Sequence, residues 1–175
     1  MYKGTETYHI NSVETIEVFY KIRTDLDKLN YAVEMTKIIR DVTEENQNSY
    51  KILQLFLNTL YVLAETDKNP ELIISIFKLK LLCFLGFTPR IQECTNCKSN
   101  EKLQFFSLRD NGFKCNTCGK QDKSCLEMSE STANAIKYIV MAPAKKLYSF
   151  NLKDESLNEL KLISKLYFND KLELM

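Results

Sequence analysis

Several residue types are scarce in this sequence of 175 residues, and each scarcity narrows the range of functions. There is one histidine, no tryptophan, four glycines and three prolines. A single histidine leaves almost no room for nucleophile–base pairs that use imidazole as the base, and so few glycines and prolines argue against a disordered or collagen-like chain. The sequence also holds no glycine-rich phosphate loop and no G-x-S-x-G or H-E-x-x-H motif. We therefore expect a binding protein that is not an enzyme.

Long apolar runs and a strong charge of one sign are also missing. The most apolar stretch, 72–87, contains Lys78 and Lys80 and falls short of the ~20 residues that span a membrane. The first residues contain no apolar run of the kind found in signal peptides. The net charge of +1 excludes nucleic-acid binding by bulk electrostatics, so any such activity needs a local patch. These features predict a cytoplasmic protein without a membrane partner.

The residues that are abundant predict a mainly helical protein, with 45% hydrophobic and 11% aromatic residues in periodic runs. We expect a first helix over 25–42 with Thr24 as N-cap. Its moderate apolar stripe is expected to consist of Leu26, Leu29, Ala32 or Val33, Thr36, and Ile39 or Val42. A second helix over 49–65 is apolar around most of its circumference, which predicts that it lies in the interior.

The third helix, 71–85, has the strongest boundary signals. Asn69 is placed to cap it, Pro70 to occupy its first position and Gly86 to end it. We expect the second and third helices to form an antiparallel pair at the centre of the core. Two further helices are expected, one that begins near Ser129 and ends before Pro143, and one over 153–168.

The first 20 residues differ from the rest of the chain. Segments 5–10 and 13–20 are rich in β-branched and aromatic residues and predict one or two strands. No other strand in the first half of the chain offers them a partner, and an isolated strand pair is only marginally stable.

The strongest motif is a pair of C-x-x-C sequences at Cys94, Cys97, Cys115 and Cys118. This spacing is typical of a structural zinc site, in which four thiolates form a closed tetrahedron. Gly119 is expected to ease the turn that closes around the metal. The segment between the pairs reads as strand 103–108, turn 110–112 and a return strand, which together make a zinc ribbon.

Other interpretations of the cysteines remain open. A redox-active C-x-x-C, or a zinc-based thiol switch, is the alternative function, although the usual βαβ context of such motifs is missing. Cys125 is either a spare metal ligand or an ordinary thiol, and Cys83 lies in an apolar helix and is expected to fill the core.

The ribbon segment has a weak basic bias, with seven basic and four acidic residues over 90–123. These lysines and arginines are either ordinary solvated residues or contacts to phosphates. Phe105, Phe106 and Phe113 either stack on bases or form a miniature core. The candidate DNA-binding residues are Arg90, Lys98, Arg109, Lys114, Lys120 and Lys123.

Several segments closely resemble the bacterial DNA repair family RecO, in the same order along nearly the whole chain. They are the C-x-x-C ribbon with Phe106-Ser107, and the sequences INSVE at 10–14, FYKIRTDLDKL at 19–29, LKLL at 79–82 and LGFTP at 85–89. The resemblance implies an N-terminal OB-fold barrel, of which residues 1–20 would be the last strand or strands, and a helical domain over 21–175. Residues 90–123 would be a zinc-ribbon insert within that helical domain.

The resemblance also implies a function in homologous recombination. Members of this family bind single- and double-stranded DNA, anneal complementary strands, and bind RecR and the acidic C-terminal tail of single-stranded-DNA-binding protein to help load RecA. They are nucleoid-associated and are not enzymes. Some members lack the four cysteines, and those that have them contain one structural zinc ion. By its place in the chain, the pocket for the tail should involve the third helix near Lys78 and Lys80. A purely structural role of the ribbon in subunit contacts is a further alternative.

Overall fold

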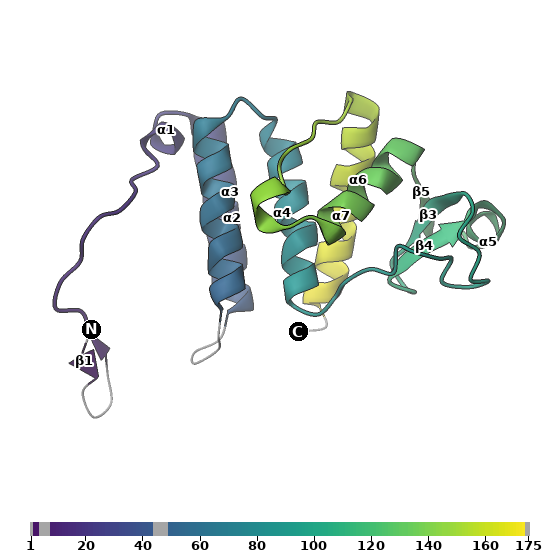
Figure 1. The fold of residues 1–175 in the computed structure, drawn as a ribbon, viewed down its shortest axis with the longest axis horizontal. Helices are drawn as coiled ribbons and strands as arrows, with labels where there is room; N and C mark the ends of the chain where they lie inside the picture. The colour runs from purple at the N-terminus through teal and green to yellow at the C-terminus, as the bar shows by residue number, and fades with distance from the viewer. Residues whose placement is uncertain (1, 4–7, 44–48, 174–175) are drawn as a thin grey trace.

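The computed structural model describes residues 2–3, 8–43 and 49–173, and these residues are mainly helical, as predicted (Figure 1). The helices are α1 (Tyr20–Arg23), α2 (Leu26–Val42), α3 (Tyr50–Glu65), α4 (Pro70–Phe84), α5 (Asn116–Gln121), α6 (Glu130–Met141) and α7 (Asp154–Leu172), with a short 3-10 helix at Ala144–Lys146. The strands are β1 (Tyr2–Lys3), β2 (Tyr8–His9), β3 (Leu103–Ser107), β4 (Gly112–Cys115) and β5 (Cys125–Glu127).

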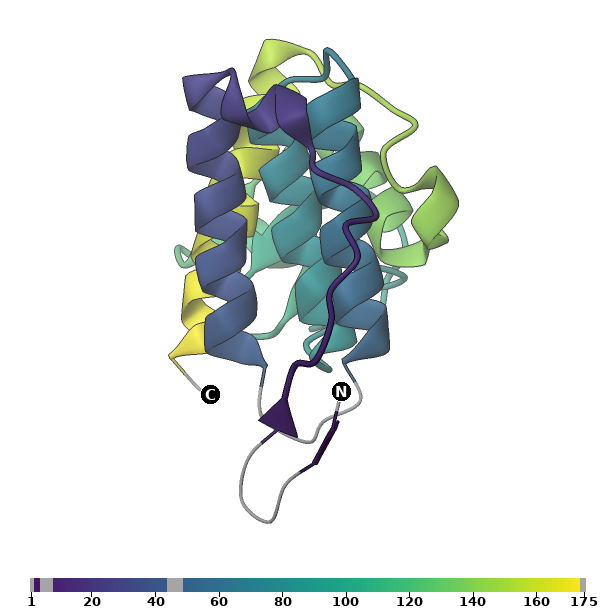
Figure 2. The ribbon, with the colours of Figure 1, turned by 90° about the vertical axis from the view of Figure 1, so that its left-hand side faces the viewer.

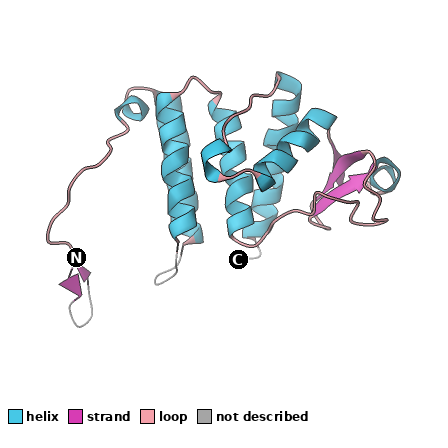
Figure 3. Cartoon of the chain, viewed as in Figure 1, coloured by secondary structure: helices cyan, strands magenta, loops and turns pink. Residues whose placement is uncertain are grey.

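Helix α4 lies at the centre of the helical domain. It packs most extensively on α7, and it also contacts α2, α3 and α6. The axes of α2, α3, α4 and α7 run roughly along one direction, and strands β3, β4 and β5 gather at the far side of α6, whereas β1 lies by the N-terminus at the opposite end (Figures 1 and 3). Ten of the fifteen residues of α4 are buried, which matches the almost continuous apolar sequence of this segment.

The predicted ends of α4 are confirmed. The Asn69 side chain accepts a hydrogen bond from the backbone N–H of Glu71, and Pro70 occupies the first turn. At the other end Gly86 has a φ of 93°, and the backbone N–H of Phe87 donates to the carbonyl oxygen of Leu82 at 2.8 Å. Glycine tolerates this left-handed conformation, so the chain leaves the helix in a Schellman turn.

The cap and the inner face of α2 differ from the prediction. Asp25, not Thr24, is the N-cap, and its carboxylate accepts hydrogen bonds from two backbone N–H groups. The buried residues are Met35, Ile38 and Val42. A helix turns by about 100° per residue, so Leu26, Leu29 and Val33 of the predicted stripe lie on the opposite side, where these three side chains are exposed. Val42, one of the two predicted ends of the stripe, is buried.

The composition of helix α3 predicted that it lies in the interior, and this prediction is wrong. Its buried residues are Leu55, Thr59, Leu63 and Ala64, whereas the opposite face, Leu53, Leu57 and Tyr61, is exposed. The predicted pairing of α3 with α4 is present, but only α4 is central. Helix α3 is an outer helix with an apolar outer face.

The ribbon is a three-stranded sheet of order β4-β3-β5, in which both neighbours run antiparallel to β3. Strand β5 and helix α5 were not predicted. Phe105, Phe106 and Phe113 are buried, which confirms the interpretation as core residues. The Phe106 ring meets the Tyr167 ring of α7 at a centroid distance of 5.1 Å, so the ribbon core is continuous with the core of the helical domain.

The N-terminal segment is extended and runs along the α2–α3 side of the molecule (Figure 2). Strands β1 and β2 form an antiparallel pair. Strand β2 lies within the first predicted strand region, 5–10, parts of which lie outside the described residues, whereas β1 precedes that region and was not predicted. The second predicted strand, over 13–20, is wrong, because 10–19 contain no strand and α1 begins at Tyr20. The assignment of these residues to an OB-fold stays a prediction.

Within the described ranges, none of the helices is long and apolar enough to cross a membrane.

Candidate metal centre and basic surfaces

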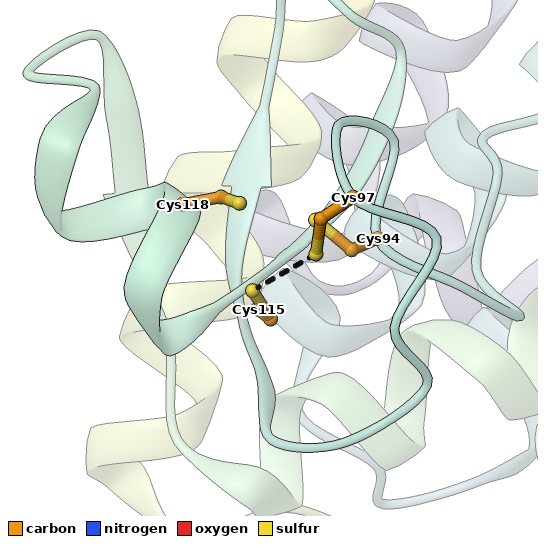
Figure 4. A group of neighbouring side chains, drawn as sticks. All are labelled: Cys94, Cys97, Cys115 and Cys118. Atoms are coloured by element: carbon orange, nitrogen blue, oxygen red, sulfur yellow. Dashed lines mark hydrogen bonds between the residues drawn. The ribbon is translucent and has the colours of Figure 1, made fainter.

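The four predicted ligands come together at one end of the ribbon (Figure 4). Cys94 and Cys97 flank a tight turn in which the backbone N–H of Lys98 donates to the carbonyl oxygen of Cys94 at 3.0 Å. Cys115 is the last residue of β4, and Cys118 lies in the first turn of α5. The chain therefore needs a turn, a strand end and a helix start to present four sulfurs to one point.

The geometry fits a tetrahedral metal ion. All four Sγ atoms lie within 4.8 Å of one another, and the Sγ atoms of Cys97 and Cys115 are 3.6 Å apart. Metal–sulfur bonds of about 2.3 Å in a tetrahedron place neighbouring sulfurs about 3.8 Å apart. Cys125 lies in β5 and is not part of the cluster. The four cysteines can hold a metal ion, as the spacing of the two C-x-x-C sequences predicted.

The ionisation of these thiols also favours a cation. Burial opposes ionisation of Cys94, but hydrogen bonds from backbone N–H groups, Cys115 first among them, outweigh it and lower the pKa to about 6. The Ser99 backbone N–H lowers the pKa of Cys97, yet contact with the other three sulfurs raises it overall to about 11. One thiolate thus suppresses ionisation of its neighbour, and a divalent cation would remove this conflict.

Neighbouring residues hold the sulfurs in place. The Asn96 side chain donates from Nδ2 to the Sγ of Cys118 at 3.3 Å, as outer residues often do around metal-bound thiolates. Gly119 has a different role from the one predicted, because it lies inside α5. A Cβ atom there would stand 2.2 Å from Cγ of Phe105, so glycine lets α5 pack against β3.

An ion cluster of the buried Lys114 and two partly exposed carboxylates lies near the hairpin turn of the ribbon. The ammonium of Lys114 is 2.6 Å from a carboxylate oxygen of Asp110 and 2.6 Å from one of Asp122. Burial lowers the pKa of Lys114, but hydrogen bonds to the two carboxylates outweigh it and raise the pKa above its usual value. Hydrogen bonds from Lys114 and then Ser124 lower the pKa of Asp122. The Lys114 ammonium is therefore occupied inside the protein.

The other five candidate DNA-binding residues are exposed but scattered over the ribbon. Lys98 pairs with Glu93 at 2.8 Å, and the Arg109 guanidinium lies 3.6 Å from Asp122. The backbone of Arg90 bridges to Gly112. Lys120 and Lys123 make no ion pair within the residues that the structure describes. The structure thus leaves Arg90, Lys120 and Lys123 with cationic groups open to a ligand.

Lys78 and Lys80 face different surroundings, although both lie on α4. The ammonium of Lys80 is buried and donates to the carbonyl oxygens of Ile139, Val140 and Ala142 at 2.9–3.1 Å. It caps the C-terminus of α6, and burial lowers its pKa. Lys78 pairs with Glu34 at 2.7 Å beside a cleft of about 260 Å³, which is also lined by Tyr31, Ile74, Lys161 and Lys165.

The comparisons with known proteins cover almost all of this chain. The family described as "Recombination protein O C terminal" matches residues 23–174. A DNA repair protein RecO of Acetivibrio thermocellus is 40% identical over 99% of this chain and 69% of its own length. The chain belongs to the RecO family.

Two further RecO proteins are also similar to this chain. The protein of Thermoanaerobacter sp. is 29% identical over 99% of this chain and 70% of the relative, and that of Bacillus subtilis is 30% identical over 85% and 58%. The chain spans between 58% and 70% of the length of these three relatives, and their whole-protein activities come to it only as proposals.

Three features of this RecO chain were missed in the sequence. The first is the set of internal partners of Lys114 and Lys80. The i,i+4 spacing of Asp110 and Lys114 was a sequence signal for the partners of Lys114, whereas no neighbouring residue indicated the partners of Lys80. A cleft between β3 and α6 is another, with Lys102 and Lys137 among its lining residues. The third is the Glu159 carboxylate, which accepts hydrogen bonds from Ser129 and Thr132 at the start of α6.

Proposed function

We propose that this chain is the helical, zinc-binding part of a recombination mediator, a DNA repair factor without catalytic activity. In this proposal the module contributes to DNA binding and strand annealing, and it binds RecR and the tail of single-stranded-DNA-binding protein so that RecA is loaded. The support is the family match over residues 23–174. Residues 1–20 would complete an OB-fold, and the protein would act in the cytoplasm at the nucleoid.

The metal in this proposal is one structural zinc ion held by Cys94, Cys97, Cys115 and Cys118. Support comes from the four sulfurs within 4.8 Å of one another. Four thiolates fill a tetrahedral shell and leave no position for a water nucleophile. The ion would supply the positive charge that lets all four thiols ionise together. It would also join the turn at Cys94 and Cys97 to the end of β4 and the start of α5.

The cleft beside α4 is the proposed site for the acidic tail. Lys78, Lys161 and Lys165 supply three ammonium groups, and Tyr31 and Ile74 supply apolar surface. Glu34 and Glu71 lie in the same cleft and pair with Lys78 and Lys161, whereas Lys165 makes no ion pair in the described part of the chain. A peptide with acidic residues and a terminal carboxylate would replace the two glutamates as partners of the lysines. Lys80 is left out because α6 occupies its ammonium.

The variants Lys165→Glu and Lys78→Glu test this site. Fluorescence anisotropy with a labelled acidic tail peptide, at several salt concentrations, should show weaker binding by at least about tenfold for each charge reversal, since a like charge then faces the peptide. Lys37→Glu, an exposed lysine of α2 outside the cleft, is the matched control and should bind normally. Equal affinity of all three variants and the unmodified chain would overturn the assignment of this cleft.

The proposed DNA contacts on the ribbon are Arg90, Lys98, Arg109, Lys120 and Lys123. Each phosphate contact that is removed should lower the slope of log K against log salt by about 0.7 for a single strand. Lys114 is no longer part of this set, because Asp110 and Asp122 hold its ammonium. DNA affinity that is independent of salt would contradict the proposed phosphate contacts.

A further inference from the structure

A second cleft, of about 240 Å³, lies between the start of β3 and α6. Asn100, Lys102 and Gln104 line one wall, and Glu130, Asn134 and Lys137 line the other. The residues on α6 are spaced by four and three positions, so they share one face of the helix. The backbone N–H of Met128 donates to the carbonyl oxygen of Gln104 at 2.9 Å, which fixes the start of α6 against β3.

The carboxamides of this cleft are free to bind a ligand. Across the described ranges, the side chains of Asn100, Gln104 and Asn134 make no hydrogen bond to the protein. Each carboxamide offers two N–H donors and one acceptor oxygen. These three carboxamides line the cleft together with the buried side chains of Leu103 and Ala133.

Two cations stand at the rim. Lys102 and Lys137 take part in no ion pair in the part of the chain that the structure describes, and the Lys137 ammonium lies 6.0 Å from the centroid of the Phe113 ring. The carbonyl oxygen of Lys102 accepts the backbone N–H of Asn116 at 3.1 Å, so this wall is tied to the start of α5. Glu130 is the one carboxylate among the lining residues of this cleft.

The residues that line the cleft fit a neutral ring better than an anion. An anion needs donors alone, and Glu130 would repel it from the interior of the cleft. A nucleobase edge presents donors and acceptors together, which carboxamides match, as Asn and Gln do at the edge of adenine. Phosphates on either side of that base would meet Lys102 and Lys137. The volume lies below the roughly 300–1,000 Å³ of sites for larger ligands, and it suits one base.

We propose that this cleft is a nucleotide subsite on the path of single-stranded DNA. One unstacked base enters between β3 and α6 and is held by Gln104 and Asn134, while Lys102 and Lys137 bind the flanking phosphates. The subsite rests on the proposed DNA-binding function and deepens it, because it places the strand along the seam between the ribbon and α6. Duplex DNA does not offer a free base and should not use the subsite.

The test is fluorescence anisotropy with the full chain loaded with zinc, a labelled mixed-sequence single strand, and the same strand made abasic. The double variant Lys102→Gln/Lys137→Gln should bind the normal strand about tenfold more weakly, with a salt slope that is lower by about 1.4. Asn134→Ala should weaken binding of the normal strand about tenfold and leave binding of the abasic strand unchanged. Circular dichroism confirms that each variant is folded.

The matched control is Lys37→Gln/Lys51→Gln, which removes two exposed charges from α2 and α3. If this control and the Lys102/Lys137 variant bind alike, the subsite is contradicted while DNA binding by the chain stands. If Asn134→Ala binds the normal strand as the unmodified chain does, base contact in the cleft is contradicted. If the unmodified chain binds no single strand at any salt concentration, the DNA-binding function itself is overturned.

Discussion

The ring of Tyr167 in α7 packs edge-on against Phe106 in β3, with centroids 5.1 Å apart. The Tyr167 hydroxyl donates to the carbonyl oxygen of Phe87 at 2.9 Å, and both ring residues are fully buried. One residue of the last helix thus secures the ribbon and the chain segment that leads into it. The ribbon is an integral part of the core as well as a metal module.

Substitution of Tyr167 should separate packing from hydrogen bonding. Tyr167→Ala removes a buried ring and should reduce the free energy of unfolding by about 3 kcal/mol or more. Tyr167→Phe keeps the ring and should lose only about 1 kcal/mol. Urea denaturation monitored by circular dichroism measures both. Equal losses for the two variants would contradict the packing role of the ring.

Metal removal should loosen the ribbon and leave the helices folded, because α4 and α7 bury their own core. We expect most of the far-ultraviolet helical signal to survive a chelator, whereas Cys94, Cys97, Cys115 and Cys118 become open to alkylation. This behaviour differs from that of small zinc fingers, which unfold without metal. Four thiols that react equally fast with and without the chelator would argue against a bound metal and favour the thiol-switch alternative.

Loss of the Lys80 ammonium should destabilise the protein more than loss of the Lys78 ammonium. Lys80→Met leaves three carbonyl groups at the end of α6 without their charged donor, and hydrogen bonds to charged groups contribute about 1.5–3 kcal/mol. Lys78→Met removes one pair with a half-exposed glutamate and should cost about 1 kcal/mol or less. Thermal melts of the two variants make the comparison, and a smaller loss for Lys80→Met would contradict the capping role.

Glu159 should make stability depend on pH in the acid range. Burial raises its pKa, but hydrogen bonds from Thr132 and Ser129 outweigh burial and hold the pKa below the usual value of 4.5. A carboxyl whose pKa is depressed on folding stabilises the protein above its unfolded pKa, and this contribution is lost as the pH falls through the folded pKa. Glu159→Gln should therefore flatten the fall of melting temperature below about pH 4.5. An unchanged pH profile would contradict this role.

The sequence predicted best where local chemistry decides the structure. Asn69 with Pro70 begins α4, and Gly86 ends it, because capping and a left-handed φ are properties of a few adjacent residues. The four cysteines were found by spacing alone. In each case the signal lay within the segment that it shapes.

The sequence failed where tertiary contacts decide. Strand β5 has three residues and exists through its pairing with β3, and α5 contains a glycine that is kept for close packing on Phe105. Helix α2 has apolar residues on two opposite faces, and only its neighbours select the buried one. Lys80 and Lys114 looked like surface cations because their carbonyl and carboxylate partners come from other elements or across a turn.

The most direct test of the account is one anisotropy titration of the zinc-loaded chain with two labelled ligands, the acidic tail peptide and a single-stranded oligonucleotide, over a range of salt concentrations. We predict that the chain binds the peptide, and that it binds the oligonucleotide with an affinity that falls as salt rises. A folded, zinc-loaded chain that binds neither ligand at any salt concentration would contradict the proposed function.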